Sequence, residues 1–233
     1  MKSKSKYAYL AALLMVVLYT GCENANELLD QHLKNGPIVY AGKIDTLDMQ
    51  SGYYRLRVNI YPTDDVNRSH CVLSWQVASG ERDSVTVDYV EANYDAAKDC
   101  YYTTIPLADV EGNLQINGQN VDTFGNRSLV TNQGAFIYGE SYVSALVNAS
   151  VNFSAGADEA TFEQKIGAVG NLVSYEQANG QFTEEVLVRE NEFPLIDAKP
   201  GGILRSKTRY LITETDIDTL TTADYLETVI PEE

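Results

Sequence analysis

The sequence predicts an all-β protein made of two tandem immunoglobulin-like β-sandwiches, and three observations support this fold class. Apolar and polar residues alternate with a period of two from about residue 38 onward, as in half-buried strands. Turn-forming pairs of Gly, Asn and Asp separate the apolar segments at short intervals. No long amphipathic helical pattern interrupts the series, and each half has about 100 residues, the size of one sandwich.

The first element is a signal peptide, predicted over residues 1–21. Lys2, Lys4 and Lys6 give it a positively charged start. The apolar stretch that follows, residues 7–18, is too short for a comfortable membrane span. A charged start followed by a short apolar segment is the pattern of a secretory signal.

The predicted signal peptide ends in the sequence LYTGC, which resembles the lipobox of bacterial lipoproteins. A small residue precedes Cys22, although Tyr19 stands where Leu is usual in that motif. We therefore expect Cys22 to be the lipid attachment site, with palmitate-type chains holding the protein at a membrane. The alternative is an ordinary secretory signal followed by a chance cysteine.

A polar tether is predicted over residues 22–37, with one short helical turn that ends before Pro37. It begins with the acidic residues Glu23, Glu27 and Asp30, which resemble the export signal of Bacteroidetes surface lipoproteins. The expected location is the outer membrane, lipid-anchored, at the cell surface. The periplasmic face of that membrane is the alternative.

The first sandwich is predicted over residues 38–132. In its clearest strand, Leu56, Val58 and Ile60 alternate with polar residues, and Gly52 and Pro62 bound the stretch. The strands expected in this half are residues 54–60, 71–77, 84–90, 101–107 and 114–121.

The second sandwich is predicted over residues 133–220, and an acidic tail that frays is predicted over 221–233. Asn179-Gly180 indicates a hairpin whose two central positions both need positive φ. Residues 157–164 are interpreted as a helical turn or a polar connection. The strands expected in this half are residues 136–138, 142–153, 172–175, 182–188, 203–211 and 217–220.

The charge of the chain argues against nucleic acid as a partner. The formal net charge is -16, and loss of the signal peptide leaves 14 Lys+Arg against 33 Asp+Glu, a net charge of -19. Such a field repels phosphates. Because the charge is spread along the chain, we interpret it as a device for solubility, with an acidic cation-binding surface as the alternative.

Two cysteines, Cys71 and Cys100, remain once Cys22 is lipidated. In an oxidising compartment this even pair forms either a disulfide or two thiols buried on strands, and the sequence leaves both open. His70 is adjacent to Cys71 in the sequence, so the two side chains would point to opposite faces of a strand. A Cys-His nucleophile is therefore not expected.

No catalytic constellation stands out. The chain has two histidines and lacks the common nucleophile, zinc and phosphate-loop motifs, so we expect no enzyme activity, catalytic residue or cofactor. A carboxylate pair for glycoside hydrolysis is the least favoured alternative. The acidic residues Asp64, Asp65, Asp122, Asp216 and Asp218 have the oxygens that Ca²⁺ takes, but we interpret them as turn residues and predict no metal site.

Three short motifs carry a resemblance to a known family. They are GNRS at residues 125–128, YGESY at 138–142 and LVN at 146–148. Together they resemble the signature of a Bacteroidetes lipoprotein family catalogued as domain of unknown function number four thousand nine hundred and ninety-eight. The pattern extends over residues 38–219, with Ala149 standing where the family has Arg and no Pro after Tyr210.

The resemblance implies two fibronectin type III-like sandwiches on a lipid anchor, near an outer-membrane glycan importer. It implies no activity, because such sandwiches serve binding, adhesion and structural roles alike. From the residues themselves we interpret the GNRS motif, Tyr138-Gly139 and Tyr142 as fixing the junction between the sandwiches.

Tyrosine is unusually frequent, at 16 residues, and its rings suit both half-buried strands and sugar-stacking surfaces. Which rings share a face stays open at this point. The residues from which a stacking surface would be drawn are Tyr53, Tyr54, Tyr61, Tyr89, Tyr94, Tyr101 and Tyr102.

The function expected from the sequence is a non-enzymatic surface lipoprotein that binds an extracellular polysaccharide or supports a neighbouring outer-membrane importer. The alternative is a structural, adhesion or protein-partner module of the cell envelope. A line of coplanar exposed tyrosine rings would favour glycan binding, and a bare edge strand or flat apolar patch would favour the alternative.

Overall fold

The computed structural model describes residues 39–77, 80–108 and 110–232. The chain divides into Met1–Tyr40 and a compact unit, Ala41–Glu233, that holds both sandwiches. The predicted signal peptide, Cys22 and the tether at 22–37 lie outside the described residues.

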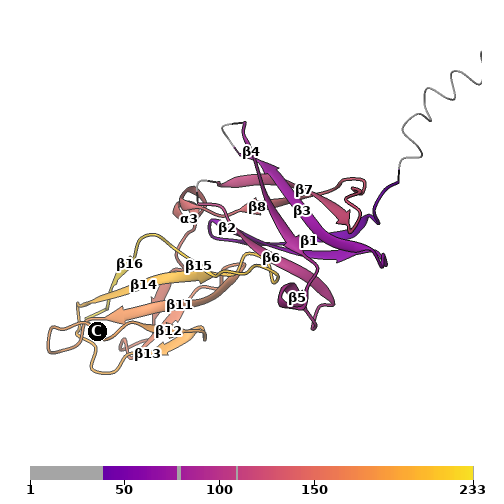
Figure 1. Ribbon diagram of the computed structural model, residues 1–233. Helices are drawn as coiled ribbons and strands as arrows, with labels where there is room; N and C mark the ends of the chain where they lie inside the picture. The colour runs from indigo at the N-terminus through magenta and orange to yellow at the C-terminus, as the bar shows by residue number, and fades with distance from the viewer. Residues whose placement is uncertain (1–38, 78–79, 109, 233) are drawn as a thin grey trace, which may run out of the picture. The chain divides into compact units, whose positions relative to one another are not determined.

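The first sandwich consists of two antiparallel four-stranded sheets (Figure 1). One sheet has the order β1-β2-β6-β5, with β1 Ile44–Gly52, β2 Arg55–Pro62, β6 Cys100–Pro106 and β5 Tyr94–Asp95. The other has the order β4-β3-β7-β8, with β4 Arg82–Asp88, β3 Arg68–Gln76, β7 Gly112–Asp122 and β8 Thr131–Ile137. A 3-10 turn, η1 Glu91–Asn93, precedes β5. This strand order matches the immunoglobulin-type sandwich.

The interior of this sandwich follows from strand alternation. Leu56, Val58 and Ile60 of β2 are fully buried, whereas the residues between them form the outer face. They pack in one core cluster with Leu73 and Trp75 of β3 in the opposite sheet. The largest part of the stabilisation therefore comes from apolar surface removed from water between the two sheets.

The second sandwich has the same strand order as the first, and most of its strands are shorter. One sheet has the order β13-β10-β9, with β13 Glu192–Pro194, β10 Glu159–Phe162 and β9 Val151–Phe153. The other has the order β12-β11-β14-β15, with β12 Val186–Val188, β11 Ala168–Tyr175, β14 Ile203–Tyr210 and β15 Leu220–Thr221. A further strand, β16 Leu226–Val229, also pairs with β14.

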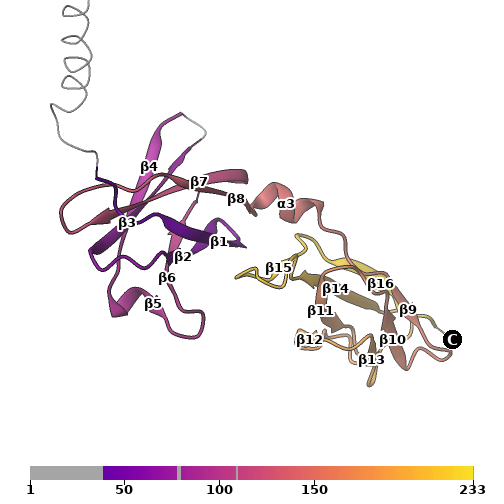
Figure 2. The same ribbon diagram turned by 90° about the vertical axis from the view of Figure 1, so that its right-hand side faces the viewer.

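A short helix, α3 Glu140–Ala145, connects β8 to the second sandwich (Figure 2). Its first amides are held from outside the helix, because the Glu111 carboxylate accepts hydrogen bonds from the N–H groups of Ser141 (3.2 Å) and Tyr142 (2.6 Å). An acidic group is favourable at a helix start. The helix replaces the first part of the strand expected at 142–153, which is wrong; only β9 within that stretch is a strand.

The boundary expected between residues 132 and 133 falls inside β8 and is also wrong. β8 pairs with β7 from Thr131 opposite Gly118 to Ile137 opposite Gly112, so it completes the first sandwich. The strand expected at 136–138 thus belongs to that sandwich, and the link to the second is α3.

Two further expectations need correction. Residues 157–164 contain β10, whose Ala160 and Phe162 face the core. The tail at 221–233 does not fray as expected: β16 pairs with β14, Ile230 is 1% exposed, and its N–H donates to Gly202 O (2.8 Å). Asp224, Glu227 and Glu232 are exposed, whereas Ile230 is part of the core.

The Asn179-Gly180 turn lies where predicted, but its geometry differs. Only Gly180 has positive φ, at 79°. The Asn179 side chain instead accepts a hydrogen bond from the N–H of Gln181 (2.8 Å), so the turn is closed by a side chain and not by a second left-handed residue.

Candidate functional site

The structure separates the tyrosine pool into three places. Tyr53 and Tyr54 lie at the junction between the sandwiches, and Tyr102 lies on an outer sheet face with the Arg57 guanidinium 4.1 Å from its ring. The remaining four gather where β2 ends and β6 begins: Tyr61, Tyr89, Tyr94 and Tyr101.

The rings in this group do not form a flat platform. Tyr89 and Tyr101 have centroids 4.6 Å apart and an interplanar angle of 62°, and Tyr94 and Tyr101 are 5.2 Å apart at 56°. The line of coplanar rings that would have favoured glycan stacking is absent from this group.

The group instead borders an open pocket of about 480 Å³, which we call the tyrosine cleft. Its lining residues are Tyr61, Pro62, Asp64, Arg68, Glu91, Tyr94, Asp99 and Tyr101. Three carboxylates therefore face one cation. Half-exposed rings beside hydrogen-bond acceptors suit a small neutral ligand rich in hydroxyl groups.

Local contacts fix the walls of the cleft. The Tyr94 hydroxyl donates to the Asp99 carboxylate, and this hydrogen bond raises the pKa of Tyr94. Burial raises the pKa of Tyr61. Both hydroxyls are neutral donors at neutral pH, so the negative charge of the cleft comes from the carboxylates.

The junction between the sandwiches is built from three chain segments: the β1–β2 turn, the start of α3, and the loop before β15. Backbone hydrogen bonds connect them. Tyr138 N–H donates to Gly52 O (3.2 Å), Tyr54 N–H donates to Tyr138 O (2.8 Å), and Ile217 N–H donates to Ser51 O (2.9 Å).

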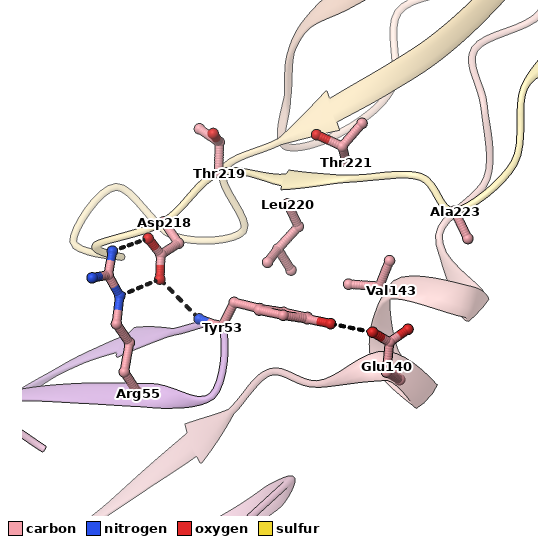
Figure 3. Close-up of a pocket in the computed structure, with 9 residues that line it drawn as sticks. All are labelled: Tyr53, Arg55, Glu140, Val143, Asp218, Thr219, Leu220, Thr221 and Ala223. Atoms are coloured by element: carbon pink, nitrogen blue, oxygen red, sulfur yellow. Dashed lines mark hydrogen bonds and ion pairs between the residues drawn. The ribbon is translucent and has the colours of Figure 1, made fainter. Parts of the chain in front are cut away.

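Asp218 is the central side chain of the junction (Figure 3). It accepts hydrogen bonds from Arg55 Nε (2.8 Å) and from the backbone N–H of Tyr53 (2.9 Å), and Arg55 Nη2 contacts its second oxygen. The Arg55 guanidinium, followed by the Tyr53 amide, holds the pKa of Asp218 below its usual range.

Two tyrosine hydroxyls add to the same contact. Tyr138 donates to Asp216 (2.9 Å), and Tyr53 donates to Glu140 at the start of α3. The hydrogen bond to Glu140 is the main cause that raises the pKa of Tyr53 to about 12. Tyr53, Tyr138 and Asp218 thus each have a hydrogen-bond partner on another of the three segments.

Gly52 is required at this place because the approach is close. A Cβ atom there would lie 2.6 Å from Asp218 Oδ2 and 2.7 Å from Ile217 Cγ1, and the second contact is with a packed side chain. Any larger residue would push the loop before β15 away from the β1–β2 turn.

Beside these contacts is an open pocket of about 730 Å³, which we call the junction pocket. Leu220 and Val143 form its apolar side, as Figure 3 shows, and the Arg55–Asp218 pair borders the other side. Arg55 and Asp218 pair with each other and Glu140 accepts the Tyr53 hydroxyl, so the pocket has the character of a packed joint more than of a reaction centre.

The signature motifs have structural partners. In GNRS, Asn126 N–H donates to Asp122 (2.8 Å) and Ser128 Oγ accepts from Asn120 N–H (2.9 Å). This motif shapes the loop between β7 and β8 inside the first sandwich, so the expected role at the junction is wrong for it. Tyr138 and Tyr142 do lie at the junction, as the hydrogen bonds above show.

Four of the acidic residues considered for Ca²⁺ accept hydrogen bonds: Asp65, Asp122, Asp216 and Asp218. Asp65 accepts from the N–H groups of Gly42 and Asn67 (both 2.9 Å), and these two bonds lower its pKa. Asp122 accepts from Phe124 and Asn126 in the same way. The part of the chain that the structure describes holds no group of three residues suited to a metal ion.

Cys71 and Cys100 are free, buried thiols. The disulfide left open by the sequence is not formed: Cys71 lies on β3 beside the Tyr89 hydroxyl, and Cys100 lies on β6 beside the Tyr61 hydroxyl. Burial raises the pKa of Cys71 to about 12 and also raises that of Cys100. Neither is an activated nucleophile.

Within the described ranges, no helix is long and apolar enough to span a membrane. No curated protein matches the chain. Solved structures that match include the FN1–FN3 domains of chicken CNTN1, at 12% identity and a TM-score of 0.37, covering 82% of this chain and 69% of that one. A segment of two fibronectin type III domains from chicken tenascin matches at 13% identity and a TM-score of 0.34, covering 80% and 99%.

The family comparison is more extensive. A domain of unknown function, DUF4998, matches residues 22–220, a range that includes the first sandwich, the second as far as the start of β15, and all three motifs of the signature. The chain belongs to the DUF4998 family.

Proposed function

We propose that this protein is a non-enzymatic structural or adhesion module of the cell envelope, whose junction holds two fibronectin type III-like sandwiches together as one unit. The observation that supports this proposal is the set of contacts centred on Asp218. Neighbouring domains in one chain move relative to each other unless their interface is extensive. Here the main-chain bond from Ile217 to Ser51, the Arg55–Asp218 ion pair and the bond from the Tyr138 hydroxyl to Asp216 connect them.

The strength of this joint comes from the number of its contacts. Each hydrogen bond contributes about 1 kcal/mol, and an exposed ion pair contributes about 0.5 kcal/mol. Because the Arg55 side chain is 48% exposed, the pair with Asp218 alone would not fix the joint. The bonds from Ile217 N–H to Ser51 O and from Tyr53 N–H to Asp218 add to it, while those of Gly52 and Tyr54 with Tyr138 hold the start of the connecting segment against the first sandwich.

The test compares Gly52→Val with a matched change outside the joint, Gly134→Val on β8, where a Cβ would meet only Leu114 O at 4.0 Å. Small-angle scattering of Gly52→Val should show a wider distribution of interdomain distances, whereas Gly134→Val should match the unchanged protein. An unchanged distribution in Gly52→Val would contradict a fixed joint.

Attachment to the outer membrane through Cys22 is part of the proposal. It is supported by the sequence LYTGC and by the cysteine usage of the chain, since the other two cysteines are buried in the first sandwich. Metabolic labelling with a palmitate analogue should mark the intact chain and not Cys22→Ser. Protease treatment of intact cells then distinguishes the surface from the periplasmic face.

A second candidate function, glycan binding, is favoured by the tyrosine cleft. Its rings and three carboxylates would accept the hydroxyl groups of a neutral sugar, and such a role fits an accessory protein beside an outer-membrane importer. Native-gel retardation on a panel of neutral polysaccharides tests it. Retardation that is lost in Tyr94→Ala but kept in Tyr102→Ala, on the outer sheet face, would support the cleft, and the absence of retardation would leave the structural role alone.

A further inference from the structure

The outer face of the larger sheet in the second sandwich carries three cations in a row. Along β14, buried and half-buried positions alternate without interruption, and the half-buried ones include Arg205, Lys207 and Arg209. Successive outward residues on a strand are roughly 7 Å apart, so the three charges extend over about 13 Å. We call Arg205, Lys207 and Arg209 the cationic row.

The row contrasts with the chain as a whole, which has 17 Lys+Arg against 33 Asp+Glu. On the β11 side its neighbours are uncharged, because Arg205, Lys207 and Arg209 lie opposite Ser174, Leu172 and Gly170. Beyond β11 on this side, the carboxylate of Glu185 stands just before β12.

On the β16 side, one carboxylate pairs with the row. Arg205 Nε contacts Glu227 Oε1 at 2.9 Å, and the two side chains are 41% and 54% exposed. So exposed a pair is weak and exchangeable. Lys207 Nζ donates to Ala223 O (2.7 Å) and Arg209 donates to Thr219 Oγ1, so the partners given to these two cations are neutral.

Aromatic rings hold two of the cations in place. The Arg205 guanidinium lies 4.1 Å from the Phe182 ring centroid, and Lys207 Nζ lies 4.5 Å from that of Tyr225. These contacts reduce the side-chain entropy that a ligand would otherwise have to remove. The carboxylate of Glu185, which precedes β12, accepts a hydrogen bond from the Tyr225 hydroxyl (2.7 Å).

We propose that the cationic row binds an extended polyanionic glycan, a polysaccharide with carboxylate or sulfate groups. Guanidinium and ammonium groups at regular spacing match an anion that repeats along a chain. β14 is paired with β11 on one side and with β15 and β16 on the other, so its face offers side chains only. A peptide strand would need a free sheet edge for its backbone, which favours the glycan over an acidic peptide.

This surface is distinct from the tyrosine cleft, which lies in the first sandwich and is acidic. The proposal therefore goes beyond the structural function and does not depend on glycan binding at the cleft. A polyanion would be repelled at the cleft, and a neutral sugar has no need of the row.

The test is affinity electrophoresis and calorimetry of the purified protein with polygalacturonate, with neutral dextran and poly-L-glutamate as comparison polymers. We expect polygalacturonate to bind and dextran not to. Lys207→Gln and Arg209→Gln should each weaken binding about tenfold, the usual loss for one charge-assisted contact. Lys207→Arg should retain it because the charge remains.

The matched control is Arg82→Gln on β4 of the first sandwich, which makes the same change in net charge at an exposed site. Its binding should equal that of the unchanged protein, and melting curves confirm that each variant is folded. Equal weakening by Arg82→Gln, binding of poly-L-glutamate as tight as that of polygalacturonate, or failure of the protein to bind polygalacturonate would each overturn the proposal.

Discussion

The two sandwiches share a strand order but differ in what fills their interiors. Among the described residues, the core of the first contains fourteen buried residues, including Trp75 and several Leu and Ile, whereas that of the second contains ten, three of them Ala. The inner face of β14 places Ser206 and Thr208 between Leu204 and Tyr210, and all four are buried. The second sandwich thus has the smaller apolar core, and both sandwiches bury polar side chains, such as Asn120 in the first and Asn171 in the second.

Asn148 is at the centre of a hydrogen-bond network in the second sandwich. Its Oδ1 accepts from Thr208 N–H (2.9 Å) and from the Thr222 hydroxyl (2.6 Å), and its Nδ2 donates to Asp224 O (2.9 Å). Thr208 in turn donates its hydroxyl to Asn171 (2.8 Å). The comparison teaches that a smaller apolar core in one copy of a fold can be accompanied by a directional polar network around one side chain.

The largest effect should come from matched core truncations, Leu73→Ala in the first sandwich and Leu204→Ala in the second. Both leucines are fully buried, so each change should lower the free energy of unfolding of its own sandwich by about 3 kcal/mol. Calorimetry should resolve which transition shifts. Identical shifts of all transitions in both variants would show that the two interiors unfold as one.

The next largest effect is expected from Asn148→Ala. This change removes the oxygen that accepts hydrogen bonds from the Thr208 N–H and from the Thr222 hydroxyl. We expect a loss of about 2 kcal/mol, carried by the second sandwich. Asn148→Asp keeps the acceptor oxygen and should lose less. Asn152→Ala, at an exposed position of β9, is the control and should remain within about 0.5 kcal/mol of the unchanged protein.

For the ion pair at the junction we predict a smaller effect on the free energy of unfolding, and one that depends on pH. Because the pKa of Asp218 is lowered in the folded state, its contribution is complete above the unfolded value of about 4 and is lost as the pH falls through the folded value. Asp218→Asn should lower stability by up to about 1 kcal/mol at pH 7 and flatten the acid side of the profile. Urea unfolding between pH 7 and pH 3 measures this, and a profile as steep as that of the unchanged protein would argue against the ion pair.

The smallest signal, thiol reactivity, separates the two sandwiches most cleanly. Cys71 and Cys100 both lie in the first sandwich and are buried, so a thiol reagent should react with neither at pH 8 while that sandwich is folded. Leu73→Ala should accelerate labelling and Leu204→Ala should not. Faster labelling in Leu204→Ala would mean that loss of the second core opens the first.

Strands with uninterrupted alternation could be predicted from the sequence. β2, β3, β7 and β14 all lie close to their expected places, because each places every second residue in the core. β1 was not identified as a strand, since a register shift between Ile44 and Thr46 puts its buried Ile44 and Leu47 three residues apart. β10 was missed because its inner positions include the small Ala160.

The junction and the helix could not be predicted from local sequence. Arg55 and Asp218 are 163 positions apart, and Asp218 reads locally as one of many acidic turn residues. The start of α3 depends on Glu111, a carboxylate that the chain brings from the first sandwich. Of the tyrosines, the sequence identified the members of the cleft but could not separate them from Tyr53, Tyr54 and Tyr102.

The position of Asp218 also sets the order in which the chain matures. During synthesis the N-terminal part of a chain emerges and folds first. Every strand of the first sandwich precedes residue 138, yet the loop that contacts Gly52 and Tyr53 contains Asp218 and follows β14 of the second sandwich. Each newly made molecule therefore passes through a stage in which the first sandwich is folded and the junction is not yet formed. A chain that terminates before this loop never forms the junction.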